Sequence, residues 1–303
     1  MSINITQLQV QQYANTIQLL LQQKGSKLAQ AVMTGSHVGK QASPVDQIGA
    51  IAANRVTSRF APMPRVDASV DRRWVFPVDY DVPQLLDTYD RLRLLNDPTS
   101  ALVQSAMYSL GRAKDDEIID AFFGNSKTGE NASTTVSFGT TLTSSNGQNV
   151  AVAHGAAGAT GLTVAKLIEA KRQLMANEVD LDSDPITAVI TSKQHGNLLN
   201  EIQVVSKDFN ETPVLVEGRV TRYLGINFLT CERLKTGTDD AAGTSTMVPM
   251  FSRSGMYLGM WNDIQASISQ RNDIQGEPWQ AYAKGTFGAT RLEEKKIVRI
   301  WCR

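Results

Sequence analysis

The chain has 303 residues and a formal net charge of zero, and 42% of its residues are hydrophobic and 20% are charged. This composition is typical of a folded globular protein and excludes a chain that is disordered throughout. The zero net charge also excludes a global field that would draw the protein to nucleic acid or to an anionic membrane. Residues 1–60 nevertheless hold five basic residues and one acidic residue, a local net charge of +4 that either a solvated surface or an acidic neighbour would explain.

Cysteine usage and hydropathy predict a soluble protein of a reducing cytoplasm. Cys231 and Cys302 have no metal-type or disulfide-type spacing, and no secretory leader is visible. The longest apolar runs, such as residues 17–21, fall far short of the roughly 20 residues that a membrane helix needs. We therefore expect free thiols, no disulfide framework and no membrane partner.

Residues 97–124 carry the clearest helical pattern of the chain. Leu102, Ala106 and Leu110 recur at helical spacing, and the stripe widens towards the C-terminal end. Asp97 is a good N-cap, a proline follows in the first turn, and a Gly-Asn pair that tolerates the left-handed conformation follows the last turn. The sequence therefore predicts a helix of about 40 Å that serves as a spine.

Two segments at the N-terminus precede this helix and have different character. Residues 3–32 are rich in glutamine and carry leucines at rough helical spacing, which predicts a helix that lies against a partner. Residues 33–43 are small and polar and indicate a flexible segment. Residues 35–41 resemble a phosphate-binding loop, but the spacing between the glycines is one residue short and Gln41 replaces the Ser or Thr that Mg²⁺ requires. This pattern argues against a nucleotide site.

Residues 55–81 predict a long, exposed pair of strands. The runs 55–61 and 73–78 are extended, and the prolines and mixed charges between them are unsuited to a central strand. An isolated hairpin is only marginally stable in water, so we expect this one to lie on another subunit, with folding back on its own chain as the alternative. The candidate intersubunit contacts are its charged residues Arg65, Asp67, Asp71, Arg72 and Arg73.

The rest of the chain mixes helices and strands and predicts an α+β fold. Residues 126–160 form an insertion rich in Ser, Thr and Gly, with a short strand at 134–138, and Thr163 is placed to cap a helix. A strand at 186–190 and a helix at 192–201 follow. Further strands are expected at 214–216, 223–229, 264–268, 279–283 and 298–302. We expect the strands of the last fifty residues, at 264–268, 279–283 and 298–302, to pack on the spine helix.

No recognisable active site is present, and we predict no catalytic, cofactor-binding or metal-binding residue. The three histidines are scattered, and no nucleophile elbow occurs. Cys231 follows an apolar strand and is more simply a buried side chain than a nucleophile. Residues 180–184 have carboxylates at alternate positions, but Pro185 stands where a calcium loop needs glycine. These observations favour a binding or assembly protein over an enzyme.

The order of these elements and two local strings resemble the major capsid protein of tailed double-stranded DNA bacteriophages, the Hong Kong 97-type fold. Residues 222–229, RYLGINFL, look like the strand with a central Leu-Gly in the axial domain of those proteins. Residues 285–300 look like their closing element, in which a Gly-Ala-Thr/Arg turn leads into the final strand of the peripheral domain. The resemblance covers nearly the whole chain.

The resemblance implies an α+β fold made of successive parts. They are an N-terminal arm (1–45), an extended E-loop (46–96), a peripheral domain (97–185) with a spine helix (97–124) and the Ser/Thr/Gly-rich insertion (126–160), an axial domain (186–255), and returning strands of the peripheral domain (256–303).

The resemblance also implies a structural protein that self-assembles into the icosahedral capsid shell around the double-stranded DNA genome of a tailed bacteriophage. Its partners would be further copies of itself in hexamers and pentamers, with scaffolding, portal and decoration proteins, and packaged DNA would lie near it without specific contact. No cofactor and no membrane are implied, and the location would be the virion capsid, assembled in the bacterial host cytoplasm. Two alternatives stay open: an encapsulin-type bacterial compartment shell and a cytosolic α/β enzyme without recognisable motifs.

Overall fold

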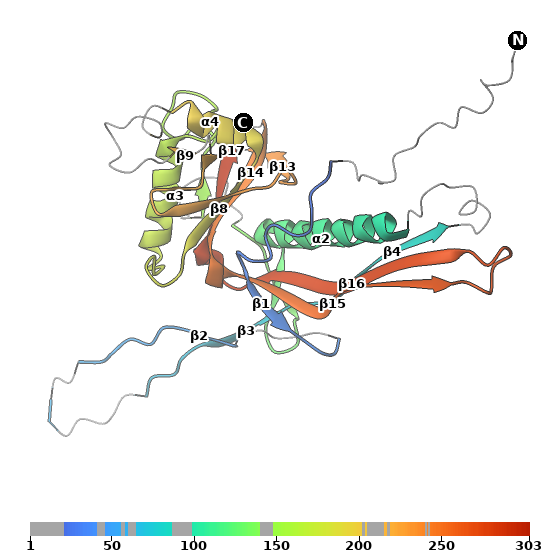
Figure 1. Ribbon diagram of the computed structural model, residues 1–303. Helices are drawn as coiled ribbons and strands as arrows, with labels where there is room; N and C mark the ends of the chain where they lie inside the picture. The colour runs from blue at the N-terminus through green and yellow to red at the C-terminus, as the bar shows by residue number, and fades with distance from the viewer. Residues whose placement is uncertain are drawn as a thin grey trace, which may run out of the picture. The chain divides into compact units, whose positions relative to one another are not determined.

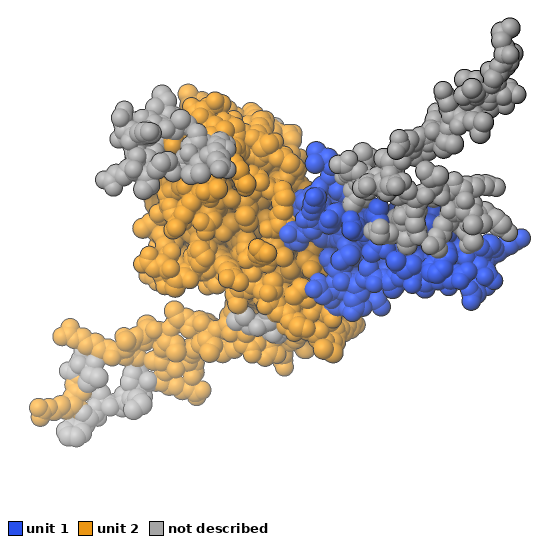
Figure 2. Space-filling model, in the orientation of Figure 1, with its two compact units in different colours: residues 1–26, 79–113, 262–286 blue, residues 27–78, 114–261, 287–303 orange. Residues whose placement is uncertain are grey.

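The computed structural model describes residues 21–40, 46–55, 58–59, 65–86, 99–139, 148–201, 204, 215–216, 219–239, 241 and 243–303. The chain divides into two compact units, which Figure 2 shows in different colours. Unit 1 comprises residues 1–26, 79–113 and 262–286, and unit 2 comprises residues 27–78, 114–261 and 287–303. Both units contain helix and strand, which confirms the predicted α+β class.

Figure 1 draws the helices and strands of the described residues and labels those for which there is room. The helices are α2 (Thr99–Phe123), α3 (Val164–Ala176) and α4 (Ser192–Leu199), with short 3-10 turns η3 (Arg253–Gly255) and η4 (Glu294–Lys296). The strands are β1 (Met33–Ser36), β2 (Asp46–Ile48), β3 (Val70–Trp74), β4 (Val78–Leu86), β5 (Ser126–Thr128), β6 (Thr134–Val136), β7 (Asn149–Val150), β8 (Ile186–Ile190), β9 (Leu215–Val216), β10 (Arg219–Val220), β11 (Arg222–Tyr223), β12 (Ile226–Thr230), β13 (Thr236–Thr238), β14 (Thr244–Ser252), β15 (Met256–Gln270), β16 (Trp279–Arg291) and β17 (Ile297–Cys302).

The core of unit 2 is a large sheet with the strand order β11-β12-β8-β14-β17-β7, in which β13 also pairs with β14. Figure 1 labels β8, β13, β14 and β17 of this sheet. Strand β8 is buried at every position, as expected for a nearly continuous apolar run that is covered on both faces. Helix α3 packs on this sheet through Ala170 and Leu174. It begins after Thr163, whose hydroxyl accepts a hydrogen bond from the Lys166 N–H at 3.4 Å. The predicted strand at 186–190 and the predicted cap are therefore confirmed.

This sheet joins segments that are distant in sequence. Strand β17, from the range assigned to the peripheral domain, pairs with β14 from the axial range. Helix α3, which lies before residue 186, packs on the same core. The described residues thus place the end of the chain and α3 in one core with residues 186–252, because strand pairing joins segments that are distant in sequence.

Helix α2 confirms the predicted spine, although Asp97, its expected N-cap, lies outside the described residues. In unit 1, Ala106 and Leu110 are buried against Ala283 of β16, and Ile264 of β15 packs on the same cluster. These contacts confirm the expected packing on the spine helix for β15 and β16, two of the strands in the last fifty residues.

Helix α2 does not end with the left-handed residue that the sequence suggested. Gly124 does not have a positive φ, so the expected left-handed residue is absent there. Its N–H instead donates to the Asp120 carbonyl oxygen at 2.9 Å, and a Cβ at Gly124 would lie only 2.7 Å from that oxygen. Glycine is needed because the chain passes close to the last helical turn.

The N-terminal segment differs from both sequence expectations. Residues 21–32 are not helical, and residues 3–20 lie outside the described residues. The buried carboxylate of Asp115 accepts hydrogen bonds from the N–H groups of Lys27 and Leu28 at 3.0 and 3.1 Å. These two N–H groups therefore bind a side chain instead of the backbone carbonyls of a helix. Residues 33–36, expected to be flexible, form β1 and pair in parallel with residues 257–260 of β15.

Two expected strands and one expected turn are corrected. The string 222–229 is a hairpin of β11 and β12 in which Leu224 and Gly225 both have positive φ, as a two-residue type I′ turn requires. Residues 288–290, expected as a turn, lie inside β16. The described part of the run 55–61 contains no strand, and the strand that pairs with β3 is β2 instead.

No helix of the described residues is long and apolar enough to cross a membrane. Cys231 and Cys302 are both buried as free thiols, as predicted. Burial raises the pKa of both thiols, and that of Cys302 reaches about 12. Both side chains therefore behave as small apolar groups of the interior.

Replacing Gly111 with alanine is expected to lower the free energy of unfolding by about 1–3 kcal/mol, although alanine favours helix. Within unit 1, a Cβ at Gly111 would lie 2.6 Å from the Gly25 backbone. Arg112 binds the same segment, because its guanidinium donates to the Gln22 side chain at 2.9 Å and to the Gln23 carbonyl at 3.2 Å. Thermal unfolding of the unassembled subunit measures the effect.

The matched control is Gly196→Ala in α4, because a Cβ there meets nothing within 4 Å. Relief of the glycine cost in a helix should raise stability by up to about 1 kcal/mol. A stability gain in both variants would contradict the close approach of the N-terminal segment to α2.

Candidate assembly site at the base of the hairpin arm

The hairpin arm, defined here as residues 46–74, is built on a small sheet with the strand order β2-β3-β5-β6. Strand β2 pairs antiparallel with β3, so that Asp46 faces Arg72 and Ile48 faces Val70. The other edge of β3 pairs with β5, which follows directly after α2. The base of the arm is therefore tied to β5 by backbone pairing within unit 2, while the described residues between β2 and β3 are exposed or half-buried.

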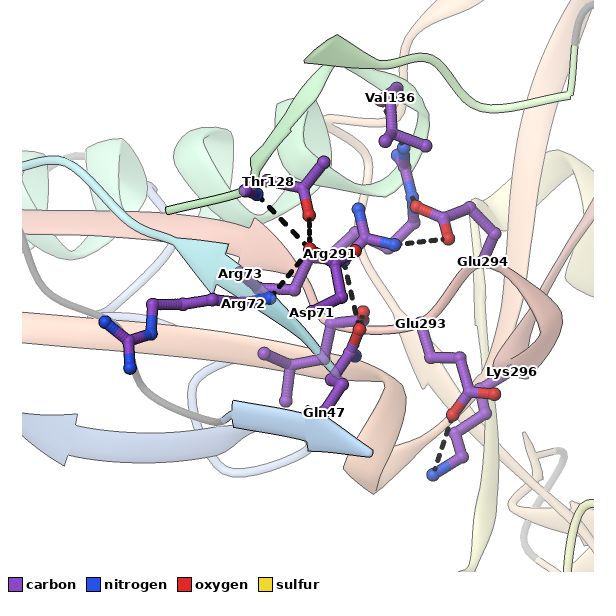
Figure 3. Close-up of polar contacts among 12 residues, drawn as sticks. Gln47, Asp71, Arg72, Arg73, Thr128, Val136, Arg291, Glu293, Glu294 and Lys296 are labelled. Atoms are coloured by element: carbon purple, nitrogen blue, oxygen red, sulfur yellow. Dashed lines mark hydrogen bonds and ion pairs between the residues drawn. The ribbon is translucent and has the colours of Figure 1, made fainter. Parts of the chain in front are cut away.

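A cluster of two arginines and one glutamate fastens this base to the C-terminal part of the chain (Figure 3). Glu294 accepts from Arg73 Nη2 at 2.7 Å through one carboxylate oxygen and from Arg291 Nε at 3.2 Å through the other. Arg73 and Arg291 are both buried. Burial lowers the pKa of the Arg291 guanidinium, and the facing Glu294 opposes that shift. The shared carboxylate thus joins β3 to the turn before β17.

Arg291 also binds the end of the spine helix. Its Nη1 donates to the Phe122 carbonyl at 3.1 Å and to the Gly124 carbonyl at 2.8 Å, and its Nη2 donates to the Val136 carbonyl at 3.2 Å. The last carbonyls of a helix lack partners within the helix and carry partial negative charge. One guanidinium therefore satisfies the C-terminal end of α2 and holds β6 beside it.

Polar contacts of Asp71, Gln47 and Trp74 complete the base of the arm. Asp71 accepts from the Thr128 hydroxyl and from the Gly129 N–H, the latter at 3.2 Å. The hydrogen bond from Thr128 is the largest of the effects that lower the pKa of Asp71. The Gln47 amide donates to the Leu292 carbonyl at 2.6 Å, and the Trp74 indole donates to the Gly129 carbonyl at 2.6 Å. These contacts hold the base of the arm in place on its own chain.

The structure divides the predicted contact residues into two groups. Asp71 and Arg73 bind their own chain at the base of the arm. Arg65 and Asp67 form an ion pair of 3.0 Å on the exposed part of the arm, and Arg72 pairs with Asp46 at 2.6 Å with both side chains about half exposed. The charges of Arg65, Asp67 and Arg72 therefore remain accessible to a neighbouring subunit.

Apolar side chains accompany these exposed charges. Ile48 and Val70, which face each other across β2 and β3, are 71% and 72% exposed. Ile51 and Val66 are exposed as well. Apolar groups on an exposed two-stranded element are typical of a surface that another protein covers.

Sequence reasoning missed Asp46, Gln47, Arg291 and Glu294. The spacing of Arg291 and Glu294, three residues apart, was the available signal, but it points equally to an exposed pair. Their role depends on Arg73, which lies 221 residues from Glu294 in the chain. No local pattern indicates such a contact.

His37 and His195 form polar contacts within the folded chain. His37 Nε2 lies 2.6 Å from the Tyr257 hydroxyl, and burial lowers its pKa. The His195 ring accepts from the Val220 N–H at 3.2 Å. Among the described residues, no group of three or more His, Cys, Asp or Glu side chains is arranged to hold a metal ion.

Comparison with known proteins gives the family. A family model described as phage capsid protein matches residues 5–303. The chain belongs to the phage capsid protein family. No curated protein sequence matches the chain.

Solved phage capsid structures share the fold of this phage capsid protein. It is similar to the capsid structure of cyanophage P-SCSP1u, with a TM-score of 0.75 and 14% identity over 100% of this chain and 95% of that chain. The capsid of cyanophage Pam1 gives a TM-score of 0.72 with 14% identity over 98% and 97% of the two chains. The capsid of a native GTA particle gives 0.69 with 14% identity over 98% and 96%.

These findings confirm the resemblance to tailed-phage capsid proteins and the Hong Kong 97-type α+β fold. The protein is a structural protein that forms a shell from copies of itself, and its place is the virion capsid.

Proposed function

We propose that the protein is the major capsid protein that tiles the icosahedral shell around the double-stranded DNA genome of a tailed bacteriophage. Hexamers and pentamers of the chain form the shell, and the hairpin arm of each copy lies across a neighbour. The observation that carries this proposal is the contrast within the arm. Its base is fixed by Arg73, Glu294 and Arg291, whereas Ile48 and Val70 just beyond it are exposed.

The parts of the chain take the corresponding roles in this proposal. Residues 1–45 act as the N-terminal arm, 46–96 as the E-loop, 97–185 as the peripheral domain and 186–255 as the axial domain, while 256–303 return to the peripheral domain. The E-loop assignment is supported by the paired strands β2 and β3 at its base. Within residues 256–303, strand β17 pairs with β14 of the axial range, so this strand joins the two domains of the proposal.

Other partners follow from the same proposal. Scaffolding, portal and decoration proteins would bind the shell, and assembly would take place in the host cytoplasm. Packaged DNA would lie against the shell without specific contacts, which agrees with a formal net charge of zero. No step of assembly in this proposal requires the protein to act as an enzyme.

Sedimentation velocity and negative-stain microscopy of the purified full chain test the proposal. We expect rings, tubes or closed shells at micromolar concentration, and shells from infected cells should protect DNA from nuclease. Shells that hold a protein cargo in place of DNA would indicate the encapsulin-type alternative. A species that stays monomeric under all salt and scaffold conditions would contradict the proposal.

The shell should be held together without covalent cross-links between subunits. Some coat proteins of this fold join an E-loop lysine to a peripheral-domain asparagine, but this chain has no lysine between Lys40 and Lys114, so its E-loop cannot supply the amine. The closing strands, residues 279–303, also contain no asparagine. Arginine cannot replace the lysine, because its guanidinium stays protonated. Mature particles boiled in detergent should give one band near 33.1 kDa. A ladder of multimers that survives reductant would refute this expectation.

A further inference from the structure

A cavity of about 280 Å³ lies in unit 2 between the C-terminal end of α2 and strands β14 and β17 of the large sheet. Its apolar lining comes from the helix end, from the segment before β13 and from β14, and comprises Ile119, Phe122, Phe123, Leu234, Met247 and Pro249. A concave apolar site with few polar groups is the usual form of a ligand pocket. Its size is at the low end for such sites, so it suits a compact ligand.

Arg299 of β17 is the buried charged group of this lining. It is 8% exposed, its Nε donates to the Asn149 side-chain oxygen at 2.6 Å, and its guanidinium lies 4.8 Å from the Trp301 ring and 5.4 Å from the Phe123 ring. Its Nη2 has no hydrogen-bond partner in the part of the chain that the structure describes. Burial lowers the pKa of Arg299 to about 10.

The charges at the cavity leave one positive charge in excess. Asp120 and Lys235 line it too, and they form an ion pair with each other. Among the described residues, no carboxylate forms an ion pair with Arg299. Because Nε already donates to Asn149, the Nη groups are the donors that remain for an anion, and a hydrogen bond to a charged group is stronger in a poorly solvated site.

We propose that this cavity binds one carboxylate group joined to a compact apolar body, with the carboxylate on Arg299 and the apolar body against Phe122, Met247 and Pro249. A free organic acid and the C-terminal end of another polypeptide both carry this chemistry. The site lies within a single unit of one chain, so the proposal stands apart from how the shell assembles.

Calorimetric titration of the full-length unassembled subunit tests this proposal with two pairs of probes. One pair is 3-phenylpropionate and 3-phenylpropanamide, and the other is the peptide Gly-Gly-Phe with a free C-terminus and the same peptide amidated. Each acid should bind at least about tenfold more tightly than its amide if the guanidinium pairs with the carboxylate. Tighter binding of the free acid indicates a small-molecule ligand, and tighter binding of the peptide indicates a chain end.

Two variants locate the binding. Arg299→Met removes the donors at similar volume and should reduce the affinity for each acid to that for its amide. Met247→Trp narrows the cavity while Arg299 remains, and it should weaken the acid and the amide together. Circular dichroism identifies a variant that fails to fold, in which case the other variant decides. Equal affinity for acid and amide, unchanged binding in a folded variant, or no binding by either acid would overturn the proposal.

Discussion

Replacing Arg291 with methionine is expected to lower the free energy of unfolding of the subunit by about 3–5 kcal/mol, because it removes one partner of a buried ion pair. The guanidinium is fully buried against Glu294 and also satisfies the carbonyls of Phe122, Gly124 and Val136. Methionine fills similar space but cannot donate to these oxygens, and each buried group that loses its hydrogen bond adds to the loss. Urea unfolding of the unassembled subunit measures it.

Arg65→Met is the matched control for this variant. Arg65 also forms an arginine–carboxylate pair, with Asp67, but its side chain is 86% exposed. Exposed pairs contribute about 0–1 kcal/mol, so this variant should unfold almost as the parent does. Similar stability losses in the two variants, or none in Arg291→Met, would contradict the role assigned to the cluster at the base of the arm.

Arg72→Glu and Arg73→Glu should fail in different ways, although the residues are neighbours. Arg72 is half exposed, so its reversal should block assembly and change the thermal unfolding of the subunit little. Arg73 is buried against Glu294, so its reversal places two carboxylates together and should destabilise the subunit itself. Sedimentation velocity and thermal unfolding of each variant separate the two effects.

A charge exchange distinguishes contact with a neighbour from contact within the arm. Arg72 pairs with Asp46 of its own chain, and Arg72→Glu combined with Asp46→Arg restores that pair with the charges reversed. If Arg72 contacts a neighbouring subunit, the double variant should stay unable to assemble. Recovery of assembly would show that the side chain acts within its own arm, and would contradict the proposed intersubunit role.

Elements with a strong local pattern could be predicted from the sequence. Helix α2 and strand β8 have repeated apolar positions, and Thr163 has the side chain that a helix start needs. Segments that pair with residues distant in sequence could not be predicted in the same way, because no local pattern marks them. Residues 33–36 look flexible because they are small and polar, yet they become a strand by pairing with residues 257–260.

The candidate site shows the same limit. Mixed charge and prolines identified the hairpin arm, but they could not separate Arg73 from Arg72. The distinction comes from Glu294, which approaches Arg73 and not Arg72 once β3 and the turn before β17 are in place. The residues next to Arg291 in the sequence do not indicate that it is buried. Its role depends on the carbonyl groups at the end of α2, which lie beside it only in the folded chain.

Cryo-electron microscopy of assembled particles tests the central claim most directly, because it locates the loop between β2 and β3 relative to neighbouring subunits. The account predicts density for residues 49–69 lying across an adjacent copy, with Ile48 and Val70 covered there and Arg73 still bound to Glu294 of its own chain. A loop that packs only on its own subunit, with Ile48 and Val70 left open to solvent in the particle, would contradict it.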